Sequence, residues 1–292
     1  MSDYPITAWL PITRDEMLKR GWEEVDVVII SGDAYVDHPA FGSALIARVI
    51  EAAGYRVAIV PQPNWRDDLR DFRKFGKPRL CFAVSAGNMD SMVNHYTANK
   101  RLRSDDAYTP GGEAGFRPDY ATVVYTRALK KLYPDVPVII GGIEASMRRL
   151  THYDYWSDSL KPSILIDSGA DLLVYGMAEK AIVEVLKRLD IQKDISWLTD
   201  VPQTAFVVDE AATTAMASQM PSILLPSFAH CLKDKSAFAR AFRDIEVESN
   251  KMTAKRLIQG SGDKAVVVNP PFATMSTAEV DAAYDLPYTR LP

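Results

Sequence analysis

Apolar runs of strand length alternate with stretches of helical periodicity over the first two thirds of the chain. Uninterrupted apolar runs are typical of strands that are buried on both faces of a parallel sheet. After the first run, apolar residues recur at helical spacing from Pro39 until Gly54 ends the predicted helix. The predicted strands are 27–30, 57–60, 80–84, 136–140 and 172–175. The pattern therefore predicts an α/β fold, Rossmann-like or flavodoxin-like, with helices on both faces of a parallel sheet.

Three regions differ in their patterning. A capping-box pair, Thr13 and Glu16, predicts a brief helix in an N-terminal arm, 1–24. The alternating part, 25–192, is predicted to be the Rossmann-like domain, and 193–292 a smaller α+β extension. Further helices are predicted at 65–77, 120–132, 180–189 and 235–250, and after the capping box of Ser276 and Glu279. In the extension we expect strands at 205–208 and 265–268 and a loop at 224–227.

Glycine and polar residues follow several of the predicted strands. Because the carboxyl ends of parallel strands meet at one edge of a sheet, these residues predict a single ligand crevice. Two glycines at a strand end would let a ligand approach the backbone. The candidates are Asp33, Asp37, His38 and Gly42 after the first strand, Ser85 after the third, Gly141, Gly142 and Glu144 after the fourth, and Glu179 after the fifth.

Two aromatic-rich loops, 88–119 and 147–163, interrupt the alternation and supply further candidates for the crevice. His95 lies in the first loop and His152 in the second. The cations of the first loop could bind phosphate or carboxylate oxygens, or could pair with neighbouring aspartates and only order the loop. These cations are Lys100, Arg101, Arg103 and Arg117. Glu144 and Glu179 could likewise bind a ligand hydroxyl or cap a helix.

Composition excludes several classes of protein. The 292 residues are 47% hydrophobic and carry net charge -4, which gives no support for a general nucleic-acid or membrane surface. No signal peptide or membrane span is predicted, and the apolar C-terminal end indicates a piece of a longer protein. Cys81 and Cys231 lie 150 positions apart, so a disulfide scaffold is not expected and the cytoplasm is the default location.

Familiar nucleotide and metal motifs are missing from the sequence. Neither GxGxxG nor GxxxxGK[ST] occurs at the strand ends, so nucleotide binding by those two routes is not expected. Asp33, Asp37 and His38 could form a metal or acid–base cluster of a metal-assisted hydrolase, although helix capping is the favoured interpretation. We assign no catalytic residue and no metal ligand in this chain.

Several segments resemble the YgiQ-type (UPF0313) family of radical-SAM proteins. They are DAYVDHPAFG at 33–42, NMDSMVNHYTANKRLRSDDAYTPGG at 88–112, GGIEAS at 141–146, and NPP with DAAYDLPYTR within 269–290. The resemblance implies the N-terminal module of an enzyme whose following barrel binds a [4Fe-4S] cluster through CxxxCxxC and uses S-adenosylmethionine. It implies no cofactor in this chain itself. The expected partners are that barrel, in the same polypeptide, and an unknown small-molecule substrate.

The resemblance extends to cobalamin-binding-type domains, whose pattern is DxHxxG, a serine about forty residues later, and GG. Asp37, His38, Gly42, Ser85 and the glycine pair at 141–142 correspond to that pattern, but Asp37 and His38 are adjacent and Gly42 lies four places after His38. We therefore expect a relative of this fold that does not bind cobalamin. A free-standing protein that binds a cobalamin- or nucleotide-like small molecule is the alternative.

Overall fold

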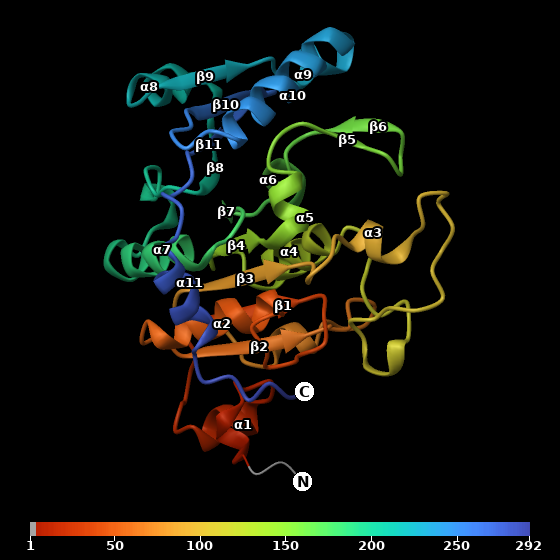
Figure 1. Ribbon diagram of the computed structural model, residues 1–292, viewed down its shortest axis with the longest axis vertical. Helices are drawn as coiled ribbons and strands as arrows, with labels where there is room; N and C mark the ends of the chain where they lie inside the picture. Colours follow the sequence, from red (N-terminus) through yellow and green to blue (C-terminus); the bar gives the residue numbers. More distant parts are fainter. Residues whose placement is uncertain (1–3) are drawn as a thin grey trace.

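The computed structural model describes residues 4–292 and contains a nine-stranded sheet (Figure 1). The strand order is β2-β1-β3-β4-β7-β8-β11-β10-β9. The first five strands in this order are parallel, and their arrangement is the flavodoxin-like order 2-1-3-4-5. They are β1 (Val27–Ser31), β2 (Val57–Pro61), β3 (Cys81–Ser85), β4 (Val138–Gly141) and β7 (Leu172–Val174). The predicted α/β fold is confirmed.

Helices cover both faces of this parallel part. Ile29 and Ala83 belong to the core cluster under α2 (Gly42–Ala52) and α7 (Glu179–Gln192). Their neighbours in sequence, Ile30 and Val84, point to the opposite face and pack with α4 (Ala121–Leu132). Successive residues of a strand alternate between the faces, so apolar runs are required where both faces are covered.

The C-terminal part extends the same sheet. β8 (Thr204–Asp209) pairs antiparallel with β7, and β11 (Lys264–Val268) pairs antiparallel with β8 and β10 (Arg256–Ser261). β9 (Ser222–Leu225) closes the edge parallel to β10. The boundary predicted at 192/193 lies between α7 and β8, and the sheet runs across it. The helices of this part are α8 (Thr213–Ser218), α9 (Phe228–Lys233), α10 (Lys235–Ser249) and α11 (Thr277–Tyr284).

The remaining elements are short. The helices are α1 (Arg14–Lys19), α3 (Ser91–His95), α5 (Gly142–Met147) and α6 (Ile164–Ser168), and β5 (His152–Asp154) with β6 (Ser159–Lys161) forms a separate hairpin. Single 3-10 turns are Ile6–Ala8, Asp71–Arg73, Pro110–Gly112, Ile195–Trp197 and Glu210–Ala212. Both predicted capping boxes, before α1 and before α11, are confirmed.

Some predicted elements are wrong. The helix expected at 65–77 is a looped segment with one 3-10 turn, because the carboxylates of Asp67 and Asp68 bind nearby backbone N–H groups and Leu69 has a φ of 61°. The helix expected from Pro39 begins at Gly42. The loop expected at 224–227 begins inside β9, and β10 was not predicted.

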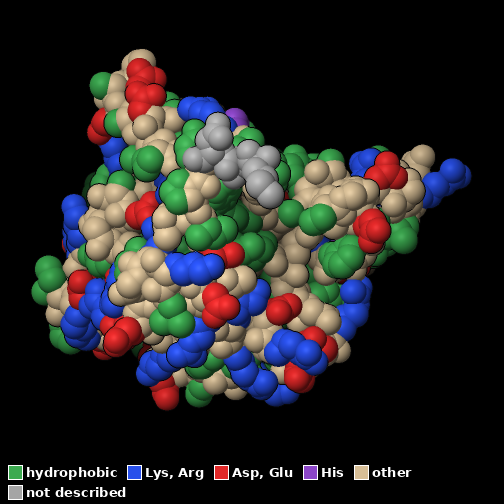
Figure 2. Space-filling model, turned by 90° about the horizontal axis from the view of Figure 1, so that it is seen from below, with side chains coloured by type: hydrophobic (Ala, Val, Ile, Leu, Met, Phe, Trp, Pro, Cys, Tyr) green, Lys and Arg blue, Asp and Glu red, His purple; other side chains and the backbone are tan. Residues whose placement is uncertain are grey.

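Charged side chains of both signs are interspersed over the face seen in Figure 2. An arm extends to the right in this view, on the side where Figure 1 shows the 88–119 loop beyond the carboxyl ends of the strands. Within residues 4–292, no helix is long and apolar enough to cross a membrane.

Candidate functional site

A cavity of about 450 Å³ lies at the carboxyl edge of the parallel strands. Ile29 of β1, Ala83 of β3 and Ile139 of β4 form its floor, with α2 on one side and α7 on the other. Tyr284 of α11 also lines it. Five of the residues predicted for the crevice line this single cavity: Gly42, Ser85, Gly141, Gly142 and Glu179.

Hydrogen bonds between loops hold the rim of the cavity. The Oδ1 atom of Asn88 accepts from the N–H of Gly42 at 2.9 Å, which joins the β3 and β1 connections. Ser146 Oγ accepts from the N–H of Gly176 at 3.1 Å and so joins the connections after β4 and β7. Gln203 donates to two carbonyls of the β7–α7 connection. These bonds join the end of β1 to that of β3 and the end of β4 to that of β7, and a bond from the Ser91 N–H to Glu144 joins the connections after β3 and β4.

Position 142 requires glycine because the ends of β3 and β4 pack closely there. Its φ of 79° is in the left-handed region, and a Cβ atom would lie 2.6 Å from Ser85 Oγ. This glycine therefore lets the ends of β3 and β4 approach each other, which differs from the approach of a ligand that the glycine pair suggested.

Asp37 is buried against the C-terminal segment. Arg48 of α2 donates to both carboxylate oxygens, and the N–H of Thr289 donates to Oδ2 at 2.9 Å. The Asp37 N–H donates to the carbonyl of Leu291. Asp37 thus fastens the last residues to the loop after β1. Tyr288 and Thr289 are accordingly buried.

Asp33 and His38 have other partners than Asp37. Asp33 and Asp106 both form 3.0 Å ion pairs with the buried guanidinium of Arg117, which also donates to the carbonyl of Ala86. Burial raises the pKa of Asp33 although Arg117 opposes this shift. His38 Nδ1 accepts from a backbone N–H two residues later.

These contacts test whether Asp33, Asp37 and His38 form the metal or acid–base cluster of a metal-assisted hydrolase. Within residues 4–292, no three His, Cys, Asp or Glu side chains are arranged to hold a metal ion, and Asp33 and Asp37 belong to separate ion pairs. The cysteines do not fit an iron–sulfur cluster either, since both are buried and burial raises the pKa of the Cys81 thiol to about 12.

Glu144 binds donors of this chain. Its Oε2 accepts from the N–H and the hydroxyl of Ser91 at the start of α3, and its Oε1 accepts from the N–H of Thr122 at the start of α4. Both helix starts have unpaired N–H groups, which a carboxylate satisfies. Glu144 therefore caps two helices and does not line the cavity.

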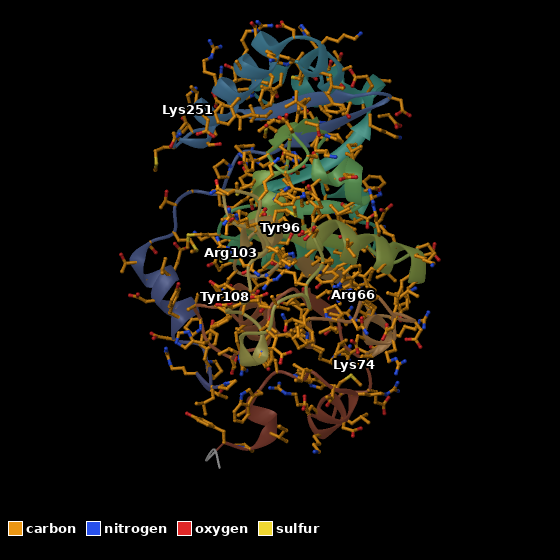
Figure 3. All side chains as sticks on the ribbon, turned by 90° about the vertical axis from the view of Figure 1, so that its right-hand side faces the viewer. Arg66, Lys74, Tyr96, Arg103, Tyr108 and Lys251 are labelled. Carbon is orange, nitrogen blue, oxygen red and sulfur yellow. The ribbon has the colours of Figure 1, made fainter. Side chains whose placement is uncertain are left out.

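The 88–119 loop contributes to a second cavity of about 510 Å³. In it, Asp119 accepts from the Tyr96 hydroxyl at 2.8 Å and lies 2.7 Å from His95 Nδ1. His95 Nε2 has no hydrogen-bond partner within the described part of the chain. Arg66 and Arg103 also line this cavity, and Figure 3 shows Tyr96 and Arg103 near the centre of this edge of the molecule, with Arg66 nearby. From the sequence, Asp119 is predicted only to be one of the aspartates that could pair with the loop cations.

The other three cations of this loop differ from Arg117 in their contacts and in their exposure to solvent. Lys100 lies over the rings of Tyr155 and Trp156 and donates to the carbonyl of Trp156. Among residues 4–292, no carboxylate forms an ion pair with Lys100, Arg101 or Arg103, and all three are exposed. Arg117 therefore orders the loop through ion pairs, whereas Lys100, Arg101 and Arg103 do not.

His152 lies apart from both cavities described above. It lines a third cavity between the β5–β6 hairpin and α10, where Phe238 and Phe242 also contribute. Burial lowers the pKa of His152, although a hydrogen bond from its ring to the carbonyl of Leu150 opposes the shift. The predicted residues thus do not share one crevice. Five line the first cavity, His95, Arg103 and Arg117 line the second, and His152 lines the third. The other candidates line none of these three cavities; they are Asp33, Asp37, His38, Lys100, Arg101 and Glu144.

Comparison with known proteins identifies the family. The profile described as Radical SAM N-terminal matches residues 9–292. UPF0313 proteins of Porphyromonas gingivalis and Bacteroides thetaiotaomicron are 58% and 57% identical to this chain over 99% and 100% of its length. A UPF0313 protein of Geobacter sulfurreducens is 49% identical over 98%. The chain spans 45%, 48% and 46% of the length of these three relatives. It belongs to the radical-SAM N-terminal family and is the N-terminal region of a UPF0313 protein.

Proposed function

We propose that this chain is the ligand-binding module of a UPF0313 radical-SAM enzyme, and that it supplies one half of a substrate cleft and the surface on which the barrel docks. The barrel, with its [4Fe-4S] cluster and S-adenosylmethionine, belongs to the remaining length of the polypeptide. The observation that carries the proposal is the cavity at the carboxyl edge, where five predicted residues from four connections converge.

The rim of this cavity supports docking. Ile143, Met177 and Tyr284 line the cavity and also expose 48%, 59% and 44% of their surface. Apolar side chains gathered around the mouth of a cavity are typical of an interaction surface. A barrel placed over this rim would exclude water from the cleft, which protects a reactive intermediate from side reactions.

Hydrogen exchange tests the docking surface. Peptides covering 141–147, 176–179 and 277–284 are expected to exchange more slowly in the full-length parent protein than in the 292-residue chain, because the barrel covers them. The peptide covering β9 at the far edge of the sheet is the control and is expected to exchange equally. Equal exchange of the rim peptides in both proteins would contradict docking and favour a free-standing binding module.

A further inference from the structure

We propose that the cavity between α2 and α7 binds an apolar molecule carrying a positively charged nitrogen, which donates to the carboxylate of Glu179. The inference rests on the proposed function, because it names the ligand class for the same cleft. Figure 1 shows α2, α7 and α11 lying together on one side of the sheet, around the place where the ligand would sit.

The cavity is suited to an apolar ligand body. Its surface comes from aliphatic side chains on the sheet and on both flanking helices. Ala83, at the middle of the floor, is smaller than the flanking floor residues Ile29 and Ile139 and leaves room above β3. A volume of about 450 Å³ falls in the range of small-molecule sites. The aliphatic lining residues are Ile29, Leu45, Ile46, Ala83, Val84, Ile139, Ile140, Ile143, Val174, Ala178 and Ile182.

Glu179 is the one charged side chain of this lining, which within residues 4–292 includes no Lys, Arg or His. Glu179 is 7% exposed, and its Oε2 atom has no hydrogen-bond partner in the described part of the chain. A buried carboxylate oxygen without a donor is costly in free energy. The start of α7 favours its negative charge, yet no side chain or backbone group within residues 4–292 donates a proton to Oε2.

The other buried carboxylates show that this chain normally supplies donors. Asp37 is paired with Arg48, and Glu144 receives three hydrogen bonds. Each of the remaining buried acids also has a cationic or hydroxyl partner. These acids are Asp26, Asp33, Asp90, Asp106, Asp154 and Glu248. Asp33 Oδ1 forms no hydrogen bond, but it lies 3.0 Å from the Arg117 guanidinium, so among the buried acids of residues 4–292 only Glu179 has neither kind of partner.

A cationic nitrogen on an apolar body matches both features at once. The apolar body would cover the aliphatic floor, and the nitrogen would supply the missing donor together with the opposite charge. A charged donor forms a stronger hydrogen bond to a carboxylate than a neutral hydroxyl does. A ligand with a carboxylate at that position would be repelled by Glu179.

Three indole probes of similar size test the charge preference in the purified chain by isothermal titration calorimetry. Tryptamine is cationic, tryptophol is its neutral hydroxyl counterpart, and indole-3-acetate is anionic. We expect tryptamine to bind about tenfold more tightly than tryptophol, with indole-3-acetate weakest. In Glu179→Gln the difference between tryptamine and tryptophol should fall to about twofold or less, whereas Glu184→Gln, on the same helix but outside the cavity, should retain it.

A filling variant separates the inference from the proposed function. Ala83→Leu places a larger side chain in the cavity and should abolish binding of all three probes. Equal binding of tryptamine and tryptophol to the unaltered chain, both blocked by Ala83→Leu, would overturn the charge preference and leave the cleft intact. Absence of binding by every probe would also overturn the inference, and the exchange experiment would still decide the docking role independently. We expect the Tm of Glu179→Gln to equal or exceed that of the unaltered chain, which would show that this variant folds.

Discussion

Replacement of Asp37 by Asn should destabilise the protein strongly. The side chains of Asp37 and Arg48 are 0% and 2% exposed, and both carboxylate oxygens accept from the guanidinium. Asparagine keeps the shape but removes the charge, so its amide N–H₂ group faces a guanidinium that also has only N–H groups. Breaking a buried ion pair on one side costs about 3–5 kcal/mol. For a chain of this length we expect Tm to fall by roughly 6–10 °C.

Urea unfolding followed by circular dichroism measures this loss. The matched control is Asp209→Asn, which makes the same chemical change in an exposed ion pair with Lys264. Exposed pairs contribute little because water and salt screen them, so the midpoint of the control should not change measurably. Hydrogen exchange at 285–291 should also increase in Asp37→Asn, since the backbone groups of Thr289 and Leu291 lose part of their anchor.

A double substitution separates the loss of the Asp37–Arg48 ion pair from general damage, since Arg48 also pairs with Glu51. Arg48→Met combined with Asp37→Asn removes both charges, so the loss should be smaller than the sum of the two single losses by at least about 1 kcal/mol. A single-variant loss below about 1 kcal/mol, together with additive behaviour in the double variant, would refute the role of this ion pair as the anchor of the C-terminal segment.

Three further predictions concern backbone, pH and thiol chemistry. Gly142→Ala should lower the free energy of unfolding by more than about 2 kcal/mol, because its φ is positive and its Cβ would contact Ser85; Gly262→Ala, with φ of 69° in open space, should lose only about 1 kcal/mol in the same urea assay. The pKa of His152 is lowered in the folded state, so the unfolded state binds more protons just below the ordinary value of 6.5; stability should therefore decrease as pH falls below 6.5, and urea midpoints of His152→Gln should depend less on pH. Cys81 should not react with Ellman's reagent at pH 8 until urea unfolds the chain; rapid reaction of both thiols in the native protein would contradict its burial.

The parallel half of the fold could be predicted because both faces of its strands are buried. Val27 to Ile30 and Val57 to Val60 are continuous apolar runs, and this pattern has few other structural solutions in a chain of this size. The position of the crevice follows from parallel topology. The carboxyl edge was therefore accessible from sequence as the place where Gly42, Ser85, Gly141, Gly142 and Glu179 meet, but the positions of the other candidates were not.

The segment 65–77 shows where periodicity fails. Leu69, Phe72 and Phe75 have approximately helical spacing, and both phenylalanines are indeed buried. The chain nevertheless forms a loop, since Asp67 and Asp68 side chains compete for backbone N–H groups that a helix would use. Apolar spacing records which side chains are buried and not which backbone conformation buries them.

The partners of polar residues could not be predicted from one sequence. Nothing local distinguishes Glu144, which caps α3 and α4 across separations of 53 and 22 residues, from Glu179, which lines the cavity. Both follow glycine and a strand end. Likewise, the pairing of Asp37 with Thr289 joins positions 252 residues apart. Such contacts depend on the completed topology.

Polar groups with a structural role can be distinguished from polar groups available to a ligand by whether the chain itself supplies their hydrogen-bond partners. A polar group that already has its donors within the chain gains little from a ligand, because binding would only exchange one set of hydrogen bonds for another. This argument removes Asp37 and Glu144 from the candidates for direct ligand contact and keeps Glu179, whose oxygen has no donor in the described residues. His95 satisfies the same criterion in the second cavity, where Asp119 orients its ring and Nε2 has no partner within residues 4–292. The most informative substitutions in this module are therefore at side chains that the fold leaves without a partner.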